Sequence, residues 1–218
     1  MTGIYKNLRK DFLVEFRNRS AVNISFAFAV ITTMSISLVA GGTSFEPHIH
    51  AILIWMIIFF SGMNGLAHTF IREEDEKNAL FLRLAYSPED IFISKLLFNI
   101  IFFTGIISVI CPLYLFFLQA RPLIPQLFIA TAFSGGLAIA SITTILGAMV
   151  SKAGGKGSLF TVLSFPLILP VMWVSITNTA LSIEGAESAN YRNVLFLIAF
   201  SGIIACISYL LFRYIWVE

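Results

Sequence analysis

Six long runs of apolar residues divide the chain, and polar segments separate them. A helix needs roughly 20 apolar residues to cross about 30 Å of hydrocarbon, and each run is long enough. A membrane β-barrel would instead show short segments in which apolar and polar residues alternate. The pattern therefore predicts an all-α membrane protein with six transmembrane helices. The predicted helices cover 21–41, 51–71, 95–118, 126–150, 159–178 and 193–216.

The segment before the first run, residues 1–20, has an amphipathic pattern. Its apolar side chains fall within about 120° of arc at 100° per residue, and its other side chains are mostly charged or amide. This favours an interfacial helix on the inner leaflet, with its basic side toward anionic headgroups, over an ordinary charged tail. The residues of the apolar arc are Ile4, Tyr5, Leu8, Phe12 and Phe16.

Composition and charge agree with a membrane protein and give it an orientation. Hydrophobic residues make up 58% of the chain and charged residues 12%, which is far from a soluble domain. If the N-terminus is cytoplasmic, only two of the 14 Lys and Arg residues, Arg121 and Arg192, fall in the outer segments. This bias predicts that both termini are cytoplasmic, because an even number of spans returns the chain to its starting side. The net charge of +2 gives no reason to expect a nucleic-acid partner.

The inner segment 72–86 begins with acidic residues, as a helix N-terminus does, and continues with apolar ones. A solvated loop has little reason to expose such apolar side chains, whereas docking to another protein or to the bilayer surface would explain them. Ser87 and Pro88 then fit the N-cap and first position of a following helix. The residues that would make these contacts are Glu73, Glu74, Asp75, Leu80, Phe81 and Leu84.

The second run carries polar residues on one helical face, among them Asn64 and His68. Such residues are costly against lipid and usually face a bundle interior or a pore. For His68 we favour a packing role over ligation of a metal or heme. His48 and His50, two residues apart in a predicted outer loop, could touch one ligand, although a solvated loop is the simpler interpretation.

Two later runs carry packing signals. Small residues recur every four positions in the fourth run, at Ala132, Gly136 and Ala140, which predicts close helix packing either within the subunit or across a dimer. The fifth run contains Pro166 and Pro170, so its helix should be kinked or broken.

No pattern in the sequence points to catalysis. All 12 acidic residues lie outside the six runs, and neither a nucleophile motif nor a His/Glu metal spacing is present. We therefore expect no catalytic, cofactor-binding or metal-binding residues, and no enzyme activity in this chain.

Three stretches resemble the heme exporter protein B family, and the resemblance runs nearly end to end. The first is the start of the chain from Leu8 to Arg19, and the second extends from Phe70 to Lys95. The third, and the most specific, is Gly154-Gly155 followed by the two prolines of the fifth run.

The resemblance implies a single permease domain, 1–218, with a fold like the ABC-2 exporters, in the bacterial cytoplasmic (inner) membrane. It implies a cytoplasmic ABC ATPase as partner, with 72–86 as the coupling element, a heme-handling membrane subunit and a homodimer. Heme would be the cargo of this cytochrome c maturation system. The alternatives are a general ABC-2 exporter for a lipid-linked or hydrophobic cargo and a non-transporting membrane scaffold.

Overall fold

A computed structural model describes residues 2–18, 20–66, 86–152, 157–186 and 191–217. Within these ranges the regular structure is entirely helical, as the apolar pattern predicts. The helices are α1 (Thr2–Asn18), α2 (Ser20–Ala40), α3 (Pro47–Leu66), α6 (Pro88–Phe117), α7 (Pro125–Lys152), α8 (Gly157–Glu184) and α9 (Arg192–Val217).

Five of these helices, α2, α6, α7, α8 and α9, are long and apolar enough to cross a membrane. The apolar part of α3, Pro47–Met63, is shorter within the described residues. The run predicted over 51–71 continues into residues 67–71, which lie outside the described ranges. Five predicted spans are therefore confirmed as helices of sufficient length, and the one predicted over 51–71 stays a prediction.

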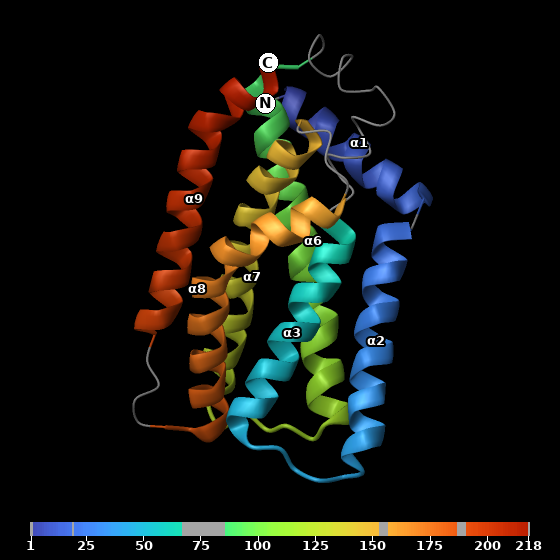
Figure 1. Cartoon of the computed structure of the whole chain (residues 1–218), viewed down its shortest axis with the longest axis vertical. Helices are drawn as coiled ribbons and strands as arrows, with labels where there is room; N and C mark the ends of the chain where they lie inside the picture. The colour runs from blue at the N-terminus through green and yellow to red at the C-terminus, as the bar shows by residue number, and fades with distance from the viewer. Residues whose placement is uncertain (1, 19, 67–85, 153–156, 187–190, 218) are drawn as a thin grey trace.

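The helices run up and down in one bundle, and α1 lies obliquely at the end where both termini are found (Figure 1). The central helix is α7, which packs against α6, α8 and α9 and buries most of its side chains. By contrast, most apolar side chains of α9 are exposed and those of α2 are nearly all exposed or half-buried, as in lipid-facing helices.

The core of the bundle is built around the indole of Trp55 on α3, which is 1% exposed. A Cβ atom at Gly135 of α7 would collide with this ring and come within 2.7 Å of the Ser175 hydroxyl on α8. The absence of a side chain at this position therefore lets three helices approach closely, which stabilises helix packing where lipid supplies no hydrophobic driving force.

Local signals explain where two of the helices begin and bend. Ser87 caps α6 by accepting a hydrogen bond from the Asp90 backbone amide at 3.2 Å, and Pro88 is the first helical residue, both as predicted. α8 contains Pro166 and Pro170. Its first turns lie across the bundle whereas the rest runs along it (Figure 1), because each proline removes a backbone donor from the helix.

Candidate functional site

α1 turns a polar stripe toward the bundle. Asn7, Asp11 and Glu15 are only 0%, 6% and 4% exposed, and their spacing of four places them on one helical face. Tyr5 of the predicted apolar arc is 67% exposed, while Ile4, Leu8 and Phe12 are half-buried. A helix is present over Thr2–Asn18, within the segment 1–20 for which an interfacial helix was predicted, but its inward face is more polar than the sequence pattern indicated. Its position on the inner leaflet stays a prediction.

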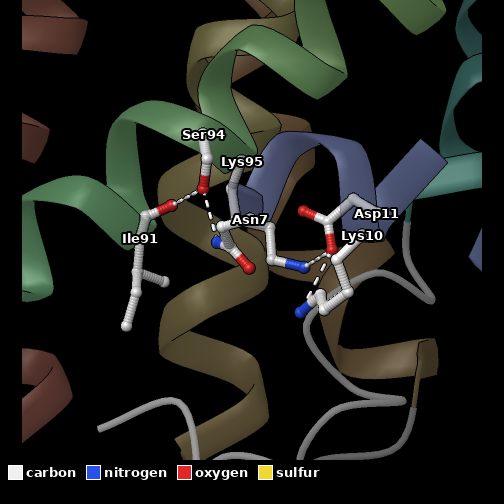
Figure 2. A network of polar contacts seen from close by, with 6 residues as sticks. All are labelled: Asn7, Lys10, Asp11, Ile91, Ser94 and Lys95. Atoms are coloured by element: carbon white, nitrogen blue, oxygen red, sulfur yellow. Dashed lines mark hydrogen bonds and ion pairs between the residues drawn. The ribbon is translucent and has the colours of Figure 1, made fainter. Parts of the chain in front are cut away.

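Two residues of this stripe, Asn7 and Asp11, have partners on α6 (Figure 2). The Lys95 ammonium, 2% exposed, donates to Asp11 Oδ1 at 3.0 Å, and the Lys10 ammonium lies 3.3 Å from the same oxygen. Asn7 Nδ2 donates to Ser94 Oγ at 2.6 Å, and Ser94 in turn donates to the Ile91 carbonyl at 2.8 Å. A buried ammonium is tolerated here because a carboxylate compensates its charge.

Contacts on both sides of this network extend the junction along α1. Near its start, a Cβ atom on Gly3 would collide with the Asp90 carboxylate, so the two helices touch closely there. Further along, the rings of Phe12 and Phe98 pack edge to face at 5.2 Å. At the far end, Glu15 Oε1 accepts a hydrogen bond from the Val22 amide of α2 at 3.3 Å. α1 is therefore docked on the N-terminal turns of α6 along most of its length.

In the sequence, α6 begins at Pro88, shortly after the predicted coupling element 72–86 ends. The predicted coupling residues lie outside the described residues, so their contacts stay a prediction. They are Glu73, Glu74, Asp75, Leu80, Phe81 and Leu84. His68 lies outside as well, and Asn64 falls in the last turn of α3.

The small-residue stripe of α7 faces α6 within the same chain. Ala132 and Ala140 are 4% and 0% exposed, and a Cβ atom on Gly136 would collide with Ile107 Cδ1 of α6. One turn beyond Ala140, Thr144 Oγ1 accepts a hydrogen bond from Asn99 Nδ2 of α6 at 2.7 Å. Of the two arrangements that the sequence left open, packing within the subunit accounts for these contacts, and the stripe gives no support to a dimer.

A buried polar group near the other end of the bundle was missed by the sequence reasoning. Asn178 of α8 donates to Thr131 Oγ1 of α7 at 2.6 Å and accepts from Asn193 Nδ2 of α9 at 3.1 Å. The Trp55 indole donates to Thr179 Oγ1 at 2.9 Å. The available signal was the run of polar residues at 177–179, at the end of the fifth apolar run, since such residues in lipid are expected to find partners on neighbouring helices.

His48 and His50 belong to the first turn of α3, so the prediction of a loop here is wrong. His48 is exposed, whereas His50 is buried with its Nδ1 3.1 Å from the Tyr114 hydroxyl of α6. Residues two apart on a helix point in different directions, and the two imidazoles line different pockets. They do not converge on one ligand, and no cluster of His, Cys, Asp or Glu suited to a metal ion occurs among the described residues.

Long apolar helices packed in one bundle around α7 define the chain as a multi-pass helical membrane protein. The model of one protein family, described as CcmB protein, matches residues 2–211. The chain therefore belongs to the CcmB protein family, which confirms the resemblance seen in the sequence. Comparison with curated proteins and with solved structures gave no match. Membership makes the chain a membrane component of heme export in cytochrome c maturation.

Proposed function

We propose that the chain is the transmembrane permease subunit of an ABC-type complex for heme export, coupled to a separate cytoplasmic ATPase. The observation that carries this proposal is the family match over residues 2–211. In this complex ATP hydrolysis belongs to the partner subunit, and heme is the cargo rather than a resident cofactor. The chain works beside a heme-handling membrane subunit and as a homodimer.

The contacts between α1 and α6 support a route for the coupling. The ATPase binds segment 72–86, and its movement reaches α6 through the first residues of that helix. Because the Asp11–Lys95 ion pair and the Asn7–Ser94 hydrogen bond attach α1 to α6, the two helices move as one unit. The buried charge makes separation of the two helices costly, which favours a rigid connection over a loose one.

The proposed arrangement in the membrane is that of an ABC-2-type permease. α3 and the residues that follow it form the second span along the chain, which completes the set of six. α1 lies on the inner leaflet. α1, which carries three exposed basic residues, Lys6, Arg9 and Arg17, lies at the end of the bundle that holds both termini (Figure 1). The positive-inside bias then makes this end cytoplasmic, in the bacterial inner membrane.

Complementation and co-purification test this function together. Cells that lack the chain are expected to accumulate c-type apocytochromes without covalently bound heme. Expression of the wild-type chain should restore heme attachment. An affinity-tagged chain should bring down an ATP-binding subunit in mild detergent. Normal maturation without the chain would contradict the heme-export role, and a chain that restores maturation without any ATP-binding partner would contradict the coupling.

Cysteine accessibility tests the orientation. Single cysteines at Ser44, Arg121 and Ser188 are expected to react with an impermeant maleimide in intact cells, whereas cysteines at Asn78 and Gly155 should react only after permeabilisation. The two native cysteines are first replaced by alanine so that only the introduced thiol is labelled. Labelling of the Asn78 position in intact cells would show that the orientation is the opposite of the proposed one. Segment 72–86 could then not be a cytoplasmic coupling element.

A further inference from the structure

An apolar pocket of about 230 Å³ lies between α1, α2 and α6. Phe12 of α1, Phe26 of α2 and Phe98 and Phe102 of α6 form much of its wall. The one carboxylate in the wall, Glu15, already accepts a hydrogen bond from the Val22 amide. The pocket therefore has almost nothing to offer a polar ligand, and its aromatic wall favours a hydrocarbon occupant.

The pocket is open on the side of α6 that carries Gly105. This glycine is exposed, and a Cβ atom added to it would meet no heavy atom within 4 Å. Ile101, one turn earlier, is 46% exposed. Both residues lie in the part of α6 that is apolar enough to cross a membrane, so the opening faces hydrocarbon.

The size of the pocket distinguishes between two apolar occupants. A helix is about 10 Å across with its side chains, too wide to enter a recess of about 230 Å³ between three helices. A lipid acyl chain is narrow and flexible enough to enter, and it is present at high concentration around any membrane protein. The pocket therefore suits an acyl chain better than a helix of a partner subunit.

The charges on α1 indicate which lipid headgroup is favoured. Both acidic residues of this helix, Asp11 and Glu15, are buried, whereas Lys6, Arg9 and Arg17 are exposed. The segregation leaves a basic outer face on the helix that forms one wall of the pocket. Lys and Arg side chains near a membrane surface attract anionic lipid headgroups, and each basic residue adds to the attraction.

We propose that this pocket holds one acyl chain of an anionic phospholipid whose headgroup lies against the basic outer face of α1. The acyl chain fills the space between α1, α2 and α6. Its site is separate from the buried ion pair, which lies on the inward face of the same helix.

Native mass spectrometry of the full chain, purified in mild detergent and incubated with phosphatidylglycerol, tests the proposal. The wild-type protein should retain one phospholipid after mild activation. Gly105→Phe adds a ring to the pocket wall at a position where a Cβ atom meets no heavy atom within 4 Å. It should lower retention roughly tenfold, the equivalent of excluding about two methylene groups. Gly105→Leu, a smaller change, should lower it less and serves if the phenylalanine variant does not fold.

Gly202 supplies the matched control, because it is an exposed glycine of α9 with equally open surroundings and lies outside the pocket. Gly202→Phe should retain phosphatidylglycerol like the wild type. Equal retention by the Gly105 and Gly202 variants would overturn the pocket assignment. The headgroup assignment is tested with phosphatidylcholine and with Lys6→Gln/Arg9→Gln/Arg17→Gln. If phosphatidylcholine is retained as well as phosphatidylglycerol, or if the triple variant keeps its preference, the role of the basic face is wrong.

Discussion

Replacing Lys95 with methionine is expected to lower the free energy of unfolding by roughly 3–5 kcal/mol, because it breaks a buried ion pair by removing one partner. Asp11 would then remain 6% exposed without the ammonium that lies 3.0 Å from its Oδ1. Its other oxygen, Oδ2, has no hydrogen-bond partner among the described residues. The Lys10 ammonium would remain 3.3 Å from Oδ1, but it is 37% exposed and compensates only part of the buried charge. Thermal unfolding in detergent should show a decrease of roughly 10 °C.

Two further variants distinguish the effect of breaking the buried ion pair on stability from the effect of removing any one positive charge. Lys10 contacts the same carboxylate at 3.3 Å but is 37% exposed, so Lys10→Met should change stability by less than about 1 kcal/mol. The double variant Asp11→Leu/Lys95→Met buries no charge and should recover much of the stability lost in Lys95→Met. A Lys95→Met protein that unfolds at the wild-type temperature would show that the junction does not depend on this pair.

Replacing Leu80 and Leu84 together with aspartate is expected to abolish co-purification of the ATP-binding subunit. The proposed coupling element uses apolar side chains as anchors in a groove of the partner. Two charges placed where apolar contact is needed should cost several kcal/mol of association, the scale of interface anchors. The chain itself should still insert into the membrane, because no residue of a predicted span is changed. The measurements are subunit stoichiometry after affinity purification and cytochrome c maturation in cells.

The acidic residues of the same segment give the control. Glu73→Gln/Glu74→Gln removes charges at the edge of the proposed interface and should alter its salt dependence while leaving the complex intact. If the double aspartate variant keeps its ATPase at wild-type stoichiometry, segment 72–86 is not the coupling element. If it loses the ATPase yet matures cytochrome c normally, the permease function is wrong and the membrane scaffold becomes the better explanation.

Several elements of the fold could be predicted because their causes are local. The beginning of α6 follows from Ser87 and Pro88, whose side chains act on the adjacent backbone. The bend in α8 follows from two prolines that remove backbone donors. Long apolar runs similarly predict helices, because lipid leaves each backbone amide no partner other than its own helix.

The inward face of α1 could not be predicted in the same way. Asn7, Asp11 and Glu15 resemble the solvent side of an amphipathic helix, and partners on other helices, among them Ser94, Lys95 and the start of α2, make their burial favourable. A pattern along one helix shows which residues share a face, but it does not show that a neighbouring helix carries complementary groups.

The histidines illustrate the same limit. His50 is separated from Tyr114 by 64 positions in the chain, so its hydrogen bond arises only when α3 packs against α6. An apolar or polar pattern cannot report a contact over that separation, and a loop was therefore the simpler prediction for residues that begin a helix.

By itself, the sequence determined the helical membrane class, the start of α6, the bend in α8 and the family, because hydrophobic runs, caps and prolines act over a few residues. Only the tertiary structure decided that the α7 stripe packs inside the chain, that Lys95 is compensated by Asp11, and that a pocket opens beside Gly105. Each of these depends on which helix lies beside which, and that arrangement is set by the packing of whole helical faces rather than by any one segment.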